Sequence, residues 1–257
     1  MKRWIAVGDS FTYLNDHLDE TKYRVKKGYL TRTLEHLQAD GIELDLINMG
    51  INGSCTTLWN DVNMPHADLY TVLLGTNDWN NGIPSGDLKS FDDKDPNTIL
   101  GSLGVLIARM KKASPDARII IMNPVERGDF VYILDPDNSA PSSAKPQNGI
   151  YLRNLAALIL EAAEHAGVDA LDLNRLSGFT TANAVKFKHV RVGSEYRDLP
   201  WPEEYDGVPF DPVHDEYPYP PEAADMTFDG LHPSDKGCEI IAELLAAKIE
   251  EVLGSKM

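Results

Sequence analysis

Short apolar runs that end in polar turns alternate with longer amphipathic segments along this chain. Residues 4–7, 67–75 and 118–125 are almost continuously apolar, whereas residues 42–50 and 168–174 mix apolar and polar positions before a turn. Runs of this length and composition, bounded by Gly, Pro, Asn or Asp, are typical of β-strands. The pattern therefore predicts five strands.

Between these strands, apolar residues recur at intervals of three and four, which is the period of an amphipathic helix. The segments 28–39, 97–113 and 148–167 have this period, and Gly167 is expected to end the third of them. A closing helix is expected to open near Pro233. Its apolar side consists of Ile240, Ile241, Leu244, Leu245 and Ile249.

Strands that alternate with helices predict an α/β fold in which a parallel sheet of about five strands is covered on both faces. Ligands of such sheets bind beyond the carboxyl ends of the strands. A length of 257 residues fits one domain spanning 1–257. One region breaks the pattern: an irregular insert at about 178–228, rich in proline and aromatic residues, which is typical of a lid or a mobile segment.

Composition and charge exclude several classes of protein. The chain is 42% hydrophobic, and no apolar run approaches the 18 or so residues that a membrane span needs. A net charge of -16 repels phosphate backbones, so nucleic acid is not expected as a partner. Cys55 and Cys238 form no metal-binding spacing and are expected to be free thiols. We expect a cytoplasmic protein, because the apolar run after Lys2 and Arg3 is too short for a signal peptide. We also expect no cofactor and no metal.

The loops after successive strands carry polar motifs that would converge at one edge of the sheet. These motifs are GDSFT at 8–12, NMGINGSCTT at 48–57, GTNDW at 75–79 and DGLHPS at 229–234. Together they supply a hydroxyl, an imidazole and a carboxylate in Ser10, His232 and Asp229, which are the groups that acyl transfer needs. Taken alone, Ser10 would be interpreted as a turn or helix-capping serine.

Four such blocks in this order resemble the SGNH, or GDSL-type, hydrolase family, and the match runs from end to end of the chain. The resemblance implies a flavodoxin-like three-layer α/β/α fold. It also implies a Ser10, Asp229, His232 triad in a serine hydrolase, with oxyanion donors from the Ser10 and Gly53 backbone amides and the Asn77 side chain. No G-x-S-x-G elbow surrounds Ser10, which separates this family from ordinary α/β-hydrolases.

Other residues of the blocks have structural interpretations. Asp9 is expected to fix its loop as a hydrogen-bond acceptor, Gly50 to serve the turn after its strand, and Asp78 to orient the Asn77 loop. Only His232 among the seven histidines lies in a motif. We expect solvated or capping roles for the other six.

Rival functions use similar fragments. A metallophosphoesterase would need Asp-x-His upstream of its Gly-Asp pair, and only seven residues precede Gly8. A nucleotide binder would need a glycine-rich first loop, whereas the first loop here, GDSFT, contains one glycine. On the same fold, a lysophospholipase or thioesterase, an acyltransferase, or a non-catalytic carbohydrate-binding module stays open.

The insert offers the clearest indication of substrate. Aromatic residues are frequent there and Leu and Ile are scarce, which favours stacking on a sugar ring over an aliphatic groove. We expect a small-molecule ester substrate with a short acyl chain, such as an acetylated carbohydrate, and we expect Trp201 and Tyr217 to contact it. The sequence does not specify the oligomeric state.

Overall fold

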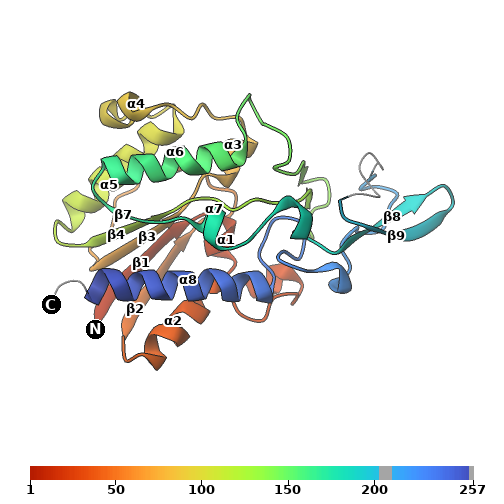
Figure 1. Ribbon diagram of the computed structural model, residues 1–257, viewed down its shortest axis with the longest axis horizontal. Coiled ribbons are helices and arrows are strands. Elements are labelled where there is room, and N and C mark those ends of the chain that lie inside the picture. Colours follow the sequence, from red (N-terminus) through yellow and green to blue (C-terminus); the bar gives the residue numbers. More distant parts are fainter. Residues whose placement is uncertain (203–209, 255–257) are drawn as a thin grey trace.

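A five-stranded parallel sheet forms the centre of the computed structural model, which describes residues 1–202 and 210–254 (Figure 1). The strands lie in the order β2, β1, β3, β4, β7, and every neighbouring pair is parallel. They span β1 Lys2–Gly8, β2 Leu44–Gly50, β3 Leu69–Leu73, β4 Arg118–Met122 and β7 Asp169–Leu171. The predicted α/β class with about five parallel strands is confirmed.

The central strands are apolar throughout because both faces of the sheet are buried. In β1, Trp4 and Ala6 belong to one hydrophobic core, Ile5 and Val7 to the other, and all four side chains are fully buried. Successive side chains of a strand point to opposite faces. A continuous apolar run is therefore what a sheet between two helical layers requires.

Helices cover the two faces of this sheet (Figure 1). On one face pack α2 (Tyr29–Ala39) and α8 (Asp235–Gly254), and on the other lie α5 (Ile99–Ala113) and α6 (Leu152–His165), with α4 (Leu88–Asp93) beyond them. The result is the three-layer α/β/α architecture. Shorter elements are α1 Ser10–Tyr13, α3 Thr76–Asn80, α7 Leu173–Leu176, η1 Leu18–Thr21, η2 Thr56–Asp61, η3 Thr181–Asn183, η4 Pro221–Ala223, β5 Phe130–Val131 and β6 Ser139–Ala140.

The ends of two helices test the predicted boundaries. After α6, Gly167 adopts φ +63°, the left-handed conformation that ends many helices, as expected. The last helix opens near Pro233, as expected, but Pro233 itself is not its first helical residue. Pro233 forms a bridge with Thr227, and Ser234 Oγ accepts from the Gly237 amide at 3.3 Å, so Ser234 caps a helix that begins at Asp235.

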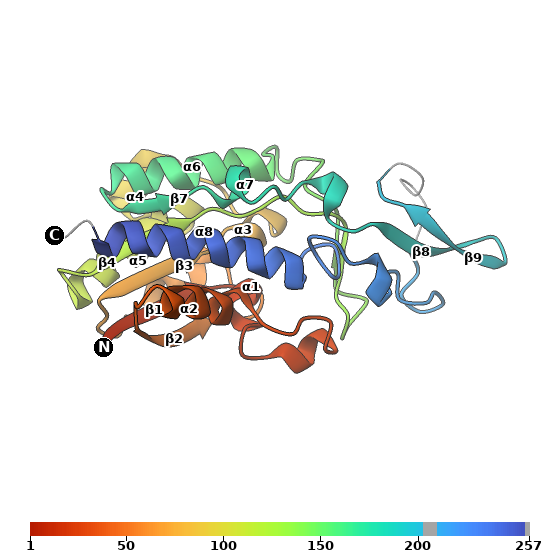
Figure 2. The ribbon, with the colours of Figure 1, turned by 60° about the horizontal axis from the view of Figure 1, so that its bottom comes forward.

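The prediction of an irregular insert at 178–228 is wrong for residues 187–200. Strands β8 (Phe187–Val192) and β9 (Glu195–Pro200) pair as an antiparallel hairpin, whose turn contains Gly193 at φ +68°. The hairpin extends beyond the α/β/α layers in both views (Figure 1, Figure 2). Residues 203–209 of the insert lie outside the described residues. Within the described chain, no helix has the length and apolar character needed to cross a bilayer.

Candidate active site

Ser10 lies directly after the first strand, at the carboxyl end of the sheet. It is the first residue of α1, and Asp9 caps this short helix by accepting from the Phe11 amide at 3.0 Å. Gly8 permits the turn, because a Cβ at that position would lie 2.0 Å from Thr12 Oγ1. The loop therefore holds Ser10 in a fixed place, and only 5% of the residue is exposed.

The segment from Asp229 to His232 folds into a turn around one carboxylate. Asp229 Oδ1 accepts from the backbone amides of Leu231 at 3.1 Å and His232 at 2.8 Å. Its second oxygen, Oδ2, accepts from His232 Nδ1 at 2.7 Å. Because a local turn supplies these bonds, the four residues suffice to orient the imidazole ring.

The His232 ring connects this turn to Ser10, which lies 222 positions away in the sequence. Since Nδ1 donates to the carboxylate, Nε2 is the acceptor, and Ser10 Oγ donates to it at 2.8 Å. Asp229 is 0% and His232 3% exposed, so water competes little for these bonds. The three residues predicted as a triad form one continuous chain of hydrogen bonds.

Two of the predicted oxyanion donors, Gly53 and Asn77, lie in a loop and in helix α3, which hydrogen bonds hold together. Gly53 adopts φ +72° with open space where a Cβ would lie, and Asn77 Nδ2 donates to the Ser54 carbonyl at 3.1 Å. Asp78 Oδ1 accepts from both Thr56 N at 2.9 Å and Thr56 Oγ1 at 2.6 Å. These bonds hold the loop of Gly53 against the helix that carries Asn77.

Two buried carboxyl groups flank these loops. Burial raises the pKa of Asp9 to about 7, with a smaller contribution from the nearby Asp78, although the Phe11 amide and His232 oppose the rise. Burial also raises the pKa of Asp78, against its bonds to Thr56. Both residues bind loop backbone, as expected for structural roles.

Four aromatic rings surround the imidazole, and the sequence analysis missed all of them as site residues. Their centroids lie 5.3–6.3 Å from that of His232. They belong to Phe11, Phe130, Tyr132 and Phe228. Phe11 lies within the first motif and Phe228 directly precedes the last one, whereas no local pattern marks the other two.

Trp201 and Tyr217, the predicted substrate contacts, form hydrogen bonds with backbone outside the triad. The Trp201 indole donates to the Thr181 carbonyl, and the Tyr217 hydroxyl donates to the Val131 carbonyl at 2.8 Å. The Arg24 guanidinium lies over the Tyr217 ring, 5.3 Å from its centroid. None of these contacts joins them to Ser10 or His232, and their role in binding substrate stays a prediction.

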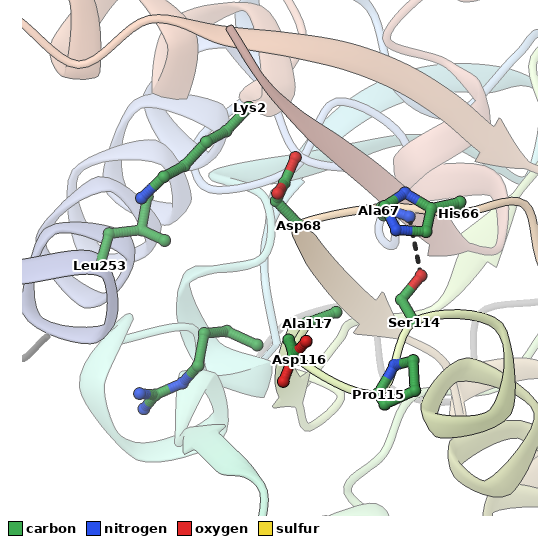
Figure 3. Close-up of a pocket in the computed structure, with 10 residues that line it drawn as sticks. Lys2, His66, Ala67, Asp68, Ser114, Pro115, Asp116, Ala117 and Leu253 are labelled. Atoms are coloured by element: carbon green, nitrogen blue, oxygen red, sulfur yellow. Dashed lines mark hydrogen bonds between the residues drawn. The ribbon is translucent and has the colours of Figure 1, made fainter.

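A pocket with a volume of about 230 Å³ lies at the amino end of the sheet, away from Ser10 and His232. Lys2, His66, Asp68 and Ser114 are among the residues that line it (Figure 3). A much smaller apolar cavity of about 10 Å³ adjoins His232. Among the described residues, one set of possible metal ligands occurs, on α2 and α8, and it includes no member of the triad; it consists of His36, Glu239 and Glu243.

Comparisons with known proteins identify the family of this chain. Residues 6–190 match the model of the GDSL-like Lipase/Acylhydrolase family. A possible lipase from Chitinophaga pinensis superposes with a TM-score of 0.93 at 41% identity over 99% of each chain. A Lactobacillus plantarum protein (TM-score 0.60, 21% identity, 100% of this chain and 98% of that one) shares the fold.

An acetyl xylan esterase, AlAXEase, also shares the fold, with a TM-score of 0.55 and 17% identity over 96% of this chain and 99% of the other. No curated protein sequence matches. The family that the four sequence blocks indicated is thereby confirmed. The chain belongs to the GDSL-like lipase/acylhydrolase family and is an esterase.

Proposed function

We propose that this esterase hydrolyses short-chain carboxylic esters, such as an acetylated carbohydrate, through Ser10, His232 and Asp229. The observation that carries the proposal is the hydrogen-bond chain from Asp229 Oδ2 through both ring nitrogens of His232 to Ser10 Oγ, at 2.7 and 2.8 Å. These are the distances over which a general base takes a proton from a nucleophile.

In the acylation step, Ser10 Oγ attacks the ester carbonyl carbon while its proton moves to His232 Nε2. The tetrahedral intermediate then collapses, and Nε2 gives that proton to the departing alcohol oxygen as the carbon–oxygen bond breaks. Water attacks the acyl-enzyme in the same way and restores the Ser10 hydroxyl. Asp229 keeps the ring in the required tautomer and stabilises the imidazolium that forms in each half-reaction.

The negative charge on the carbonyl oxygen would be stabilised by the Ser10 and Gly53 amides and by Asn77 Nδ2. Ser54 occupies one of the two N–H groups of the Asn77 amide, which leaves the second for the oxyanion. The absence of a side chain at Gly53 lets the substrate approach its amide. Each such donor typically contributes about 2.7–4 kcal/mol to transition-state stabilisation.

The composition of the insert favours a short acyl chain over a long one, since aromatic residues are frequent there and Leu and Ile are scarce. The apolar cavity of about 10 Å³ beside His232 is too small for an acetyl group, and Ser10 does not line it. An acetyl xylan esterase shares this fold, so the architecture can carry such an activity but does not specify the substrate.

The test uses p-nitrophenyl esters from acetate to decanoate, together with a phosphonate ester and mass spectrometry. We expect acetate to be cleaved fastest, activity to survive exhaustive chelation, and the phosphonate to modify Ser10 alone. An adduct on Ser54 would overturn the nucleophile assignment. Faster cleavage of long chains would favour a lysophospholipase, and no cleavage of any ester would favour a binding module.

A further inference from the structure

Of the four rings around His232, one reaches the surface. Phe11, Phe130 and Phe228 are buried, whereas Tyr132 is half-buried, and its centroid lies 6.3 Å from that of the imidazole. In the proposed reaction the departing alcohol takes its proton from His232 Nε2, so it must leave beside this ring. Tyr132 is therefore the ring of the four that an alcohol leaving toward the surface can reach.

A polar cluster surrounds the Tyr132 hydroxyl. It donates to Glu20 Oε2 at 3.2 Å, and the Tyr13 hydroxyl donates to the other oxygen, Oε1, at 2.7 Å. The Tyr13 ring stacks on His17, with 3.9 Å between centroids. Each Glu20 oxygen accepts one tyrosine hydroxyl, so the carboxylate keeps lone pairs that can accept further donors.

Asn52, from the loop that contains Gly53, completes this cluster. Asn52 is exposed, directly precedes Gly53, and lies close enough to the Tyr132 hydroxyl to oppose the rise of its pKa. Burial and Glu20 together raise the pKa of Tyr132 to about 12, so its hydroxyl keeps its proton at neutral pH. Tyr132 thus connects the ring that protonates the alcohol with the loop proposed to bind the oxyanion.

We propose that Tyr132, Glu20 and Asn52 form a subsite for the alcohol part of the substrate, and that this alcohol is a polyol such as a partly acylated sugar. This inference rests on the proposed function. The carboxylate and the amide supply acceptors and donors for free hydroxyl groups, and the exposed part of the tyrosine ring covers the C–H face of a sugar. An aliphatic alcohol would displace water from these polar groups without replacing the hydrogen bonds of that water, which costs binding free energy.

The test compares three acetate esters. Methyl glucoside with a single acetyl group offers free hydroxyls, its fully acetylated counterpart offers none, and p-nitrophenyl acetate contains no sugar. For Glu20→Gln and Tyr132→Phe we expect kcat/KM on the monoacetylated sugar to fall about 10-fold, mostly through KM, because a hydrogen bond to a charged group is lost. Cleavage of p-nitrophenyl acetate should stay within about twofold, since the triad is intact.

Matched controls lie in and just after η1, the short helix that carries Glu20. Asp19 and Tyr23 are exposed neighbours of Glu20, and we expect Asp19→Asn and Tyr23→Phe to change neither activity. Preference for the monoacetylated over the fully acetylated sugar should also disappear in Glu20→Gln. Far-UV circular dichroism and thermal unfolding confirm that the variants are folded.

Each outcome bears on a different part of the inference. Equal losses on all three esters would mean that the cluster supports the triad, and no loss on the monoacetylated sugar would mean that it does not meet the alcohol. Either result overturns the subsite. If the wild type cleaves p-nitrophenyl acetate but neither sugar ester, the substrate class is wrong. If it cleaves no ester, the proposed function itself fails.

Discussion

Both ends of the central sheet carry a serine, a histidine and an aspartate, but only one end connects them. At the carboxyl end, Ser10, His232 and Asp229 share two hydrogen bonds. At the amino end, Ser114, His66 and Asp68 line the 230 Å³ pocket of Figure 3. Within the described residues, no hydrogen bond joins any two of these three side chains.

The polar groups at the amino end are occupied by backbone and by neighbouring side chains. Ser114 Oγ accepts from the Ala67 amide at 2.9 Å (Figure 3) and lies 3.0 Å from the Tyr70 hydroxyl. Asp68 Oδ2 accepts from the Arg3 amide at 2.7 Å, and His66 is exposed. Residue types and pocket size therefore do not distinguish a hydrogen-bonded Ser-His-Asp chain from an unconnected set, whereas the order of donors and acceptors does.

The largest expected difference between the two ends concerns their serines. Ser10→Ala removes the nucleophile and should lower kcat for p-nitrophenyl acetate by at least about 10⁴-fold. Ser114→Ala removes a buried acceptor and should lower the free energy of unfolding by about 1–3 kcal/mol without changing kcat. Steady-state kinetics and urea unfolding of both variants measure this. Full activity in Ser10→Ala would contradict the triad.

The second expected difference is between two asparagines at the carboxyl end, Asn77 in α3 and Asn81 directly after it, in their effect on kcat. Asn77→Ala removes one proposed oxyanion donor and should lower kcat by about 100- to 1000-fold with little change in KM, because the oxyanion exists mainly in the transition state. Asn81 Nδ2 donates to Cys55 Sγ at 3.3 Å instead, so Asn81→Ala is the matched control and should stay within about threefold. If Asn77→Ala mainly raises KM, the residue binds the ground state.

A third difference concerns how the stability of the two ends responds to pH. Burial raises the pKa of Asp9 from 3.8 to about 7, so between these values the folded protein holds a proton that the unfolded chain has released. The free energy of unfolding therefore falls as pH rises through this window. In Asp9→Asn, the decrease between pH 5 and pH 8 should be smaller, by an amount on the order of 2–4 kcal/mol.

The exposed Asp68 at the amino end provides the control for this effect. Asp68→Asn should leave the decrease in stability between pH 5 and pH 8 as it is in the wild type. Urea unfolding at both pH values measures it for the three proteins. The same decrease in Asp9→Asn as in the wild type would show that Asp9 ionises normally in the folded state.

The strands of the sheet and the turn around Asp229 were predictable because each depends on residues that are close in sequence. The run from Trp4 to Val7 predicts a doubly buried strand by itself, and the turn around Asp229 is made by bonds that span two or three residues. The family resemblance then supplied the pairing of this turn with Ser10. The structure brings the two segments to hydrogen-bond distance.

The missed features depend on contacts between distant segments. Tyr132 and Glu20 are 112 positions apart, and neither lies in a motif. The β8–β9 hairpin escaped detection because Lys188 is buried on its inner face, where it lies 3.7 Å from Asp129, and a charged residue at an inward position disrupts the expected alternation. Local patterns cannot show which distant group will compensate such a charge.

The smallest expected difference concerns two tyrosine hydroxyls, one at each end of the sheet, that donate to backbone carbonyls. Tyr217 donates to Val131, next to Tyr132 in the chain, and Tyr70 donates to Pro65. Either Phe variant loses a hydrogen bond and should lower the free energy of unfolding by about 0.5–1.5 kcal/mol.

Because only Tyr217 supports the segment beside His232, only Tyr217→Phe should also change kcat/KM for the monoacetylated sugar, by up to about threefold. Tyr217→Ala removes the ring as well. If the ring stacks on the sugar, as the sequence predicts for Tyr217 and Trp201, this variant should lose on the order of a further 1 kcal/mol of transition-state stabilisation, measured as kcat/KM on the monoacetylated sugar. An equal kinetic change in Tyr70→Phe would show that loss of stability alone explains the effect.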